Sequence, residues 1–108
     1  MEGVSLEALA DRHGTPLYVY SAGTILDHYR RLRGVLRALD PLVCYSVKAN
    51  SNLAILSLLA RAGSGFDVVS GGELERVRKA GGKPGKCVFA GVGKTEEEIE
   101  AGLRAGVK

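Results

Sequence analysis

A strand followed by a helix occurs three times in the second half of the chain, and this repeat constrains the fold more than any other feature. Short apolar, β-branched runs predict strands at 42–47, 65–69 and 86–90, and a segment with helical periodicity follows each of them. The repeat length is about 21 residues, which suits one strand and one crossover helix. The sequence therefore predicts the α/β class, with a parallel sheet and right-handed connections.

Capping residues and glycines mark the ends of the three helices, which are predicted at 52–62, 72–80 and 96–105. Two of the helices should begin with a capping box. The boxes pair Ser70 with Glu73 and Thr95 with Glu98. Each helix ends at a glycine, which favours the left-handed conformation that terminates helices. These glycines are Gly63, Gly81 and Gly106.

The first 41 residues have a different pattern, typical of a helix–strand–helix segment. Ser5 can cap a helix over 6–12, and the alternating residues 17–20 predict a strand. Ser21 can cap a long helix that Asp40-Pro41 stops. Its apolar positions form one stripe. They are Ile25, Tyr29, Leu32, Val35, Leu36 and Leu39. We therefore divide the chain into an N-terminal segment, 1–41, and a βα part, 42–108.

The predicted helix 52–62 indicates that more protein is needed to cover it. Its only polar interior positions are Ser57 and Arg61, so most of its surface requires burial. Three strands cannot supply that cover, and their sheet would keep open edges. We expect the 108 residues to form the opening third or less of a larger α/β protein.

The net charge of +3 does not by itself exclude any class of partner, but the distribution of the charges argues against a nucleic-acid surface. The excess comes from one helix that holds Arg30, Arg31, Arg33 and Arg37. The only aromatic residue among them is Tyr29, which lies on the apolar face and cannot stack on bases. A solvated helix face is the favoured interpretation, and no nucleic-acid partner is expected.

The cysteines and the N-terminus indicate a cytoplasmic protein. Cys44 and Cys87 fall in predicted strands without a CxxC motif or a nearby histidine, which is typical of small buried side chains in a reducing compartment. A disulfide or a metal site is therefore not expected. The first 30 residues lack a signal-peptide pattern, and no apolar run approaches membrane-spanning length.

Lys48 is the first candidate for chemistry, because it ends the predicted strand 42–47. Parallel α/β folds place their chemistry at the C-terminal ends of strands. Desolvation there can free a lysine amine as a nucleophile. Strand alternation would put Lys48 on the same face as Ser46 and Cys44. The alternative is a strand-end lysine that extends to water.

Asp67 is the second candidate, because it lies between Phe66 and Val68 in the next strand and should be substantially buried. A buried carboxylate requires a partner. Lys48 on the neighbouring strand is one possibility. A backbone amide or an arginine is the other, since strand register cannot be read from the sequence.

Two loops after strands complete the candidate set. Ser70-Gly71-Gly72-Glu73 lies where a helix N-terminus favours an anion, although a capped helix start is the favoured interpretation. It matches neither a GxGxxG fingerprint nor a Walker P-loop. Lys94, in the loop after the third strand, either faces a ligand or is solvated.

Two motifs carry a resemblance to a known family. They are Tyr-Ser-Val-Lys-Ala-Asn at 45–50 and Gly-Phe-Asp-Val-Val-Ser-Gly-Gly-Glu-Leu at 65–74. Thr-Pro-Leu-Tyr-Val-Tyr at 15–20 and Phe-Ala-Gly-Val-Gly-Lys-Thr at 89–95 extend the match over nearly the whole chain. The sequence closely resembles the diaminopimelate decarboxylases, which are alanine-racemase-like (fold type III) enzymes dependent on pyridoxal 5'-phosphate (PLP).

The resemblance implies a fold and a site. Residues 42–108 would be the first three or so βα units of a PLP-binding (β/α)8 TIM barrel, and strand 17–20 would join the C-terminal β-domain of the full protein. Lys48 would bind PLP as a Schiff base, and Asp67 would lie near it. The other PLP-binding and substrate-binding groups of the family lie later in its chains, and no residue here matches them.

The resemblance also implies a reaction, the decarboxylation of meso-2,6-diaminopimelate to L-lysine and CO2 in lysine biosynthesis. The enzyme would be a homodimer, and the 108 residues alone would be inactive. Two alternatives remain open. One is an ornithine- or arginine-type decarboxylase, which shares the lysine and the Gly-Phe-Asp element but usually departs at Ser-Gly-Gly. The other is a non-catalytic PLP-binding barrel protein.

Overall fold

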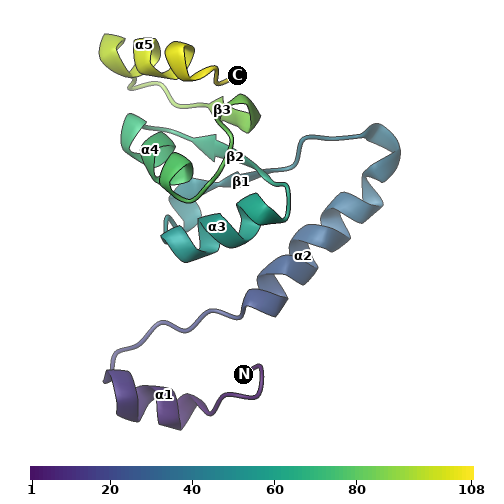
Figure 1. The fold of residues 1–108 in the computed structure, drawn as a ribbon, viewed down its shortest axis with the longest axis vertical. Coiled ribbons are helices and arrows are strands. Elements are labelled where there is room, and N and C mark those ends of the chain that lie inside the picture. The colour runs from purple at the N-terminus through teal and green to yellow at the C-terminus, as the bar shows by residue number, and fades with distance from the viewer.

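The computed structural model describes all 108 residues and confirms the α/β class. Three parallel strands form one sheet in the order β1-β2-β3, and helices connect them (Figure 1). The helices and strands are α1 (Leu6–His13), α2 (Ala22–Val35), β1 (Cys44–Ser46), α3 (Leu53–Arg61), β2 (Gly65–Val68), α4 (Gly71–Lys79), β3 (Cys87–Phe89) and α5 (Glu96–Ala105). Each strand lies within its predicted range, and each of the last three helices lies within one residue of its own.

Only one of the two faces of the sheet is covered by helices, and this distinguishes a barrel from a doubly wound sheet. Phe66, Val68 and Cys87 alternate onto one face and join the side chains of α3 and α4 in the hydrophobic core. The opposite face holds Ser46 beside Asp67 and contributes nothing to that core. A sheet with helices on one face only is typical of a barrel wall, whereas doubly wound sheets carry helices on both.

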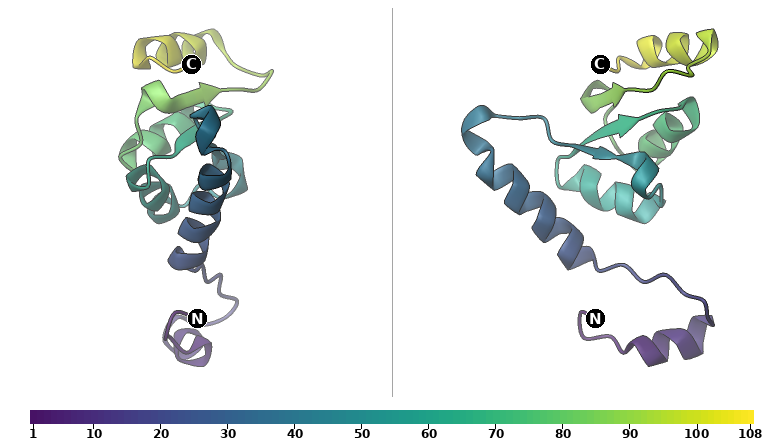
Figure 2. Two further views of the ribbon diagram at one scale, coloured as in Figure 1. Left: turned by 90° about the vertical axis from the view of Figure 1, so that its right-hand side faces the viewer. Right: turned by 180° about the vertical axis from the view of Figure 1, so that it is seen from behind.

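The predicted strand at 17–20 is absent from the sheet. Residues 17–20 are extended but have no ladder partner, and they link α1 to α2. Figures 1 and 2 show α1 standing apart from the sheet and its helices. A strand requires a neighbour to accept its hydrogen bonds, and this segment pairs with none of the three strands. Its pairing with a later β-domain stays a prediction.

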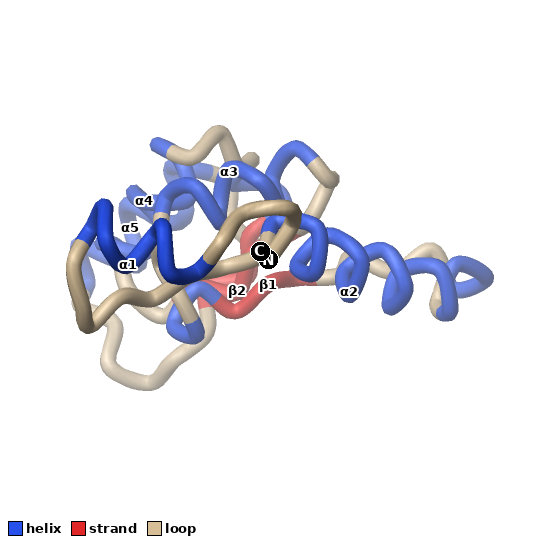
Figure 3. Tube along the Cα trace, turned by 90° about the horizontal axis from the view of Figure 1, so that it is seen from below, coloured by secondary structure: helices blue, strands red, loops and turns tan.

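Helix α2 begins at the predicted cap and ends earlier than expected. The Ser21 hydroxyl accepts a hydrogen bond from the Thr24 amide, but the α-helix stops at Val35 and a 3-10 turn covers 37–39. Of the apolar stripe, only the first half packs against the core, through Ile25 and Tyr29. Figure 3 shows the far end of α2 projecting away from the strands.

Most of the predicted helix caps are confirmed. Gly63, Gly81 and Gly106 all have positive φ angles, and Thr95 and Glu98 form the predicted capping box. The second predicted box is only half formed. The Ser70 hydroxyl accepts from the Glu73 amide, but the Glu73 carboxylate accepts from the Val69 amide, at 2.8 Å, instead of from the Ser70 amide.

The structure is open for its length. Its radius of gyration is 16.0 Å, whereas a compact domain of this size has about 13 Å. Helix α3 buries Ile55, Leu56 and Leu59, while Leu53 at its start is 42% exposed. Neither cysteine forms a disulfide. No helix combines the length and the apolar character needed to cross a membrane.

Candidate functional site

Lys48 lies on a turn and not on the strand that was predicted to carry it. Strand β1 ends at Ser46, and Val47–Ala49 form a 3-10 turn that contacts β2. The expectation that Lys48 shares a face with Ser46 and Cys44 is therefore wrong, because strand alternation stops before it. The side chain is exposed and forms no ion pair.

The link between this turn and α3 is held by hydrogen bonds. The Tyr45 hydroxyl donates to the Asn50 carbonyl at 3.2 Å, and the Asn52 amide donates to Asn50 Oδ1 at 3.0 Å. The Asn52 side chain then caps α3 by accepting from the Ala54 amide. From α4, Arg76 Nε donates to the Ser51 carbonyl at 2.9 Å. Lys48 is thus exposed on a backbone that is fixed on its C-terminal side.

Asp67 is half-buried on β2 and has a partner that was not expected. Ser46 Oγ donates to Asp67 Oδ2 at 3.1 Å, because the strand register places these two residues side by side. No ion pair joins Asp67 to Lys48 or to an arginine, and no backbone amide donates to it. Neither partner that the sequence suggested is therefore present, whereas the expected burial of Asp67 is confirmed in part. The role of Ser46 could be read only from the register.

The chemistry of these groups suits an aldehyde cofactor. Lys48 offers a primary amine without a partner at the C-terminal edge of the sheet. Asp67 offers a carboxylate on the face that no core residue covers, with Ser46 bonded to one of its oxygens. A primary amine can bind an aldehyde carbon covalently. The remaining walls of such a site are not formed by these residues.

The start of α4 does not present a free anion site. The Gly71 amide donates to Glu98 Oε1 at 2.8 Å, and the Thr95 amide donates to Glu98 Oε2 at 3.1 Å. These hydrogen bonds, above all that from Gly71, lower the pKa of the Glu98 carboxyl. A carboxylate from the next βα unit therefore occupies the position predicted for an anion. The sequence indicated Glu98 as a capping residue but gave no signal of this second contact.

The side chain of Lys94 contacts its own loop. Its Nζ donates to the Gly91 carbonyl in its own loop and lies 5.2 Å from the centroid of the Phe89 ring. A cation above an aromatic ring is weakly stabilising. Free solvation therefore does not fully describe Lys94, and a contact with a ligand stays a prediction.

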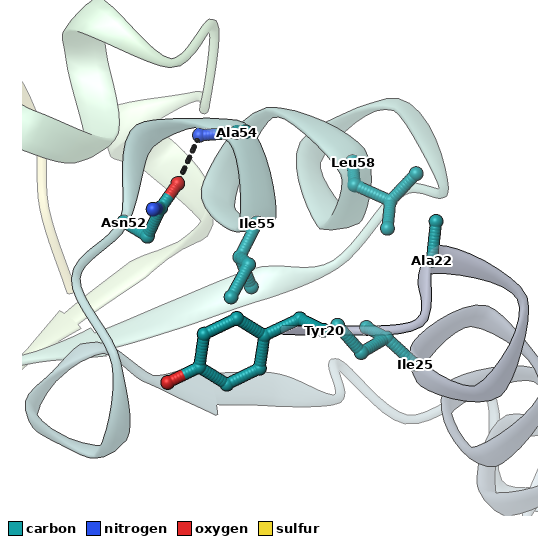
Figure 4. A pocket seen from close by; sticks show the side chains of 7 residues that line it. All are labelled: Tyr20, Ala22, Ile25, Asn52, Ala54, Ile55 and Leu58. Atoms are coloured by element: carbon teal, nitrogen blue, oxygen red, sulfur yellow. Dashed lines mark hydrogen bonds between the residues drawn. The ribbon is translucent and has the colours of Figure 1, made fainter. Parts of the chain in front are cut away.

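Two apolar hollows lie on the side of the sheet that the helices cover. Figure 4 shows the first, of about 380 Å³, in which Tyr20 lies below Ile55 at the start of α3. The second, of about 310 Å³, lies between α2 and β1 and is lined by Tyr29 and Tyr45 among others. Neither hollow includes Lys48 or Asp67. The candidate site is therefore an open edge in this chain and not a closed pocket.

Comparisons with known proteins agree with this geometry. Residues 22–108 match the family described as "Pyridoxal-dependent decarboxylase, pyridoxal binding domain". Diaminopimelate decarboxylase of Pseudomonas fluorescens is 57% identical over 106 residues, which are 98% of this chain and 26% of that protein.

Solved structures show the same similarity. Diaminopimelate decarboxylase from Helicobacter pylori complexed with L-lysine is 45% identical, with a TM-score of 0.91, over 95% of this chain and 26% of that one. The enzyme from M. jannaschii, also in complex with L-lysine, is 41% identical, with a TM-score of 0.94, over 99% of this chain and 26% of that one. The chain spans about a quarter of the length of the proteins that it matches.

Proposed function

The chain belongs to the pyridoxal-dependent decarboxylases, and from this premise we propose that it forms the N-terminal quarter of a diaminopimelate decarboxylase. The cofactor implied by the family is PLP. The proposed reaction converts meso-2,6-diaminopimelate and a proton into L-lysine and CO2. The observation that carries the proposal is the similarity over 98% of the chain to a protein of that name.

In this proposal Lys48 holds PLP through its Nζ amine. When bound, PLP supplies a sink for the electron pair that the departing carboxylate leaves on the α-carbon. The Lys48 amine, exposed and without an ion pair, can then carry the proton that replaces CO2. Asp67 faces the uncovered side of the sheet with Ser46 bonded to it, and we propose that it lines the cofactor site.

Covalent labelling of the full-length enzyme tests this assignment. The enzyme is incubated with PLP, its visible spectrum is recorded, and borohydride reduction is followed by mass spectrometry of the peptides. We expect a pyridoxyl group on Lys48 and a loss of turnover by about 10³-fold or more in Lys48→Ala. Lys79→Ala is the matched control, because Lys79 is an exposed lysine on α4. A label on surface lysines alone would contradict the role of Lys48.

The choice of substrate is tested by steady-state assays on the same enzyme. Diaminopimelate should be turned over with the highest kcat/KM, ahead of ornithine, arginine and lysine. A preference for ornithine or arginine would indicate the polyamine-type decarboxylases of the same fold. Labelling of Lys48 without turnover of any of these amino acids would indicate a non-catalytic PLP-binding barrel.

The proposal also covers the oligomeric state, the cellular location and the binding partners of the enzyme. We propose a homodimeric, cytoplasmic enzyme that binds a small amino acid and no nucleic acid. Of the arginines on the long N-terminal helix, Arg33 lies in the last turn of α2, where a cation complements the helix dipole, which supports a structural role for its charge. Sedimentation of the full-length enzyme at two concentrations checks the dimer, and a salt-dependent gel shift with duplex DNA checks the exclusion of nucleic acid.

A further inference from the structure

The position of the Lys48 amine depends on a backbone turn of three residues. Val47 anchors the start of the turn, because its side chain is completely buried in the core. Lys48 itself makes no ion pair that would hold it. The C-terminal side of the turn, at Asn50, is therefore the second point that decides where Lys48 lies.

Tyr45 supplies a contact at that second point. Its ring packs against the hydrophobic core from β1, on the face that the helices cover. From there its hydroxyl spans the turn and donates to the Asn50 carbonyl at 3.2 Å. Burial raises the pKa of the Tyr45 phenol, so the hydroxyl keeps the proton that it donates. The two ends of the Lys48 turn are thus tied to one core, through Val47 and through Tyr45.

We propose that Tyr45 is a positioning residue for Lys48, which holds the turn so that the amine stays where the cofactor meets it. The inference rests on the proposed function, in which Lys48 carries PLP. A preorganised amine retains a covalently bound group better than one on a loosened turn, because less motion must be frozen when the bond forms. The hydroxyl of Tyr45 would act on the cofactor only through Lys48.

The test uses Tyr45→Phe in the full-length enzyme, which removes the hydroxyl and keeps the ring. Cofactor retention is followed as the loss of the visible PLP band during dialysis, and rebinding as its return after PLP is added to the apoenzyme. We expect loss to be about threefold to tenfold faster, the range for one hydrogen bond. The borohydride label should remain on Lys48.

Tyr29→Phe is the matched control. The Tyr29 ring also packs against the core, and its hydroxyl makes no hydrogen bond within the chain. It should retain PLP as the wild type does. Urea midpoints of the three apoenzymes separate a local effect from a global one. Retention by Tyr45→Phe equal to that of Tyr29→Phe would overturn the proposal, even if both variants were less stable.

A second variant removes a different hydrogen bond at the same turn, the one that the Asn50 side chain accepts. Asn50→Ala removes the acceptor for the Asn52 amide and leaves the Tyr45 hydroxyl in place. We expect faster PLP loss here too, and additional loss in the double variant with Tyr45→Phe. Unchanged retention in Asn50→Ala would overturn the link between the turn and the cofactor. Absence of the label from Lys48 in the wild type would instead contradict the proposed function itself.

Discussion

The thiol of Cys87 is buried and therefore a poor nucleophile. Its side chain is completely buried in the core, and burial raises the pKa of its thiol from 9.0 to about 11. Cys44, on β1, is only half-buried, and burial raises its pKa as well. Since the thiolate is the reactive form, both cysteines act as small apolar side chains at neutral pH.

We expect maleimide at pH 8 to modify Cys87 about a hundredfold more slowly than an unstructured cysteine, because the raised pKa reduces the thiolate fraction by that factor. Labelling should become complete in urea. Peptide mass spectrometry of the full-length enzyme measures both rates, and Cys44→Ser isolates the signal from Cys87. Rapid labelling of Cys87 in the native enzyme would show that the core opens at β3.

The candidate residues could be read from the sequence more easily than their contacts. Lys48 was evident because a lysine ends a buried apolar run, and Asp67 because a carboxylate lies between two core residues. The contact between Asp67 and Ser46 depends on which residues face each other across β1 and β2. That register is set by the packing of whole elements, so local sequence does not reveal it.

At the scale of elements, Glu98 joins two successive βα units. Its carboxylate caps α5 through Thr95 and also accepts from Gly71 at the start of α4. One side chain therefore satisfies amides at the N-termini of two helices. The loops that follow β2 and β3 are held together at the edge of the sheet where Lys48 lies.

We expect Glu98→Gln to increase amide exchange at Gly71 about threefold to tenfold at neutral pH. The folded state lowers the pKa of Glu98 below its ordinary value of 4.5, so the wild-type protection is complete above that pH and is lost as the pH falls through the lowered pKa. The variant should lack this acid transition. Site-resolved exchange measures both, and Glu96→Gln, which removes a charge from the same helical turn, serves as the control.

Gly65 allows β1, β2 and the segment before β3 to approach closely. A Cβ at this position would lie 2.6 Å from the Lys86 carbonyl oxygen and 2.7 Å from Cys44 Sγ. We expect Gly65→Ala to destabilise the enzyme by about 1–3 kcal/mol. Gly34→Ala is the contrasting change, because nothing lies near that Cβ in α2. It should stabilise by about 0.5–1 kcal/mol. Thermal unfolding measures both, and equal effects would contradict the close approach at Gly65.

The N-terminal caps of the helices were predicted well, whereas the strand at 17–20 has no partner in this chain. A helix satisfies its amides within itself and is capped by nearby residues such as Ser5, Ser21 and Thr95. A strand is defined by its partner, and alternation alone cannot supply one. The strand before Lys48 is shorter than predicted, because its last predicted residue, Val47, begins the 3-10 turn.

At the scale of the whole molecule, the chain forms part of a barrel in which only one face of the sheet is covered. The helices bury one face of the sheet, and only 13 of 108 residues are buried in total. The uncovered face and the outer edge of β1 have no partner in this chain. The outer edge of β3 is bonded only to Lys108, whose amide donates to the Cys87 carbonyl and whose carbonyl accepts from the Phe89 amide. An unpaired sheet edge readily associates with other chains.

We expect the isolated 108-residue chain to bind a hydrophobic dye and to unfold without a cooperative transition. It should neither retain PLP nor catalyse decarboxylation. Fluorescence, calorimetry and a CO2-release assay check these expectations, with the full-length enzyme as the positive control. Sharp cooperative unfolding of the isolated chain, or any turnover by it, would contradict them.

The uncovered face of the sheet also matters while the protein is being synthesised. When a ribosome has made these residues of a protein such as the Pseudomonas fluorescens relative, about three quarters of the polypeptide is still to be translated. At about 5–20 residues per second, the face waits for tens of seconds before the last strands can close over it. Codon usage downstream of this segment, and chaperones at the exit tunnel, would then decide how much nascent protein escapes aggregation.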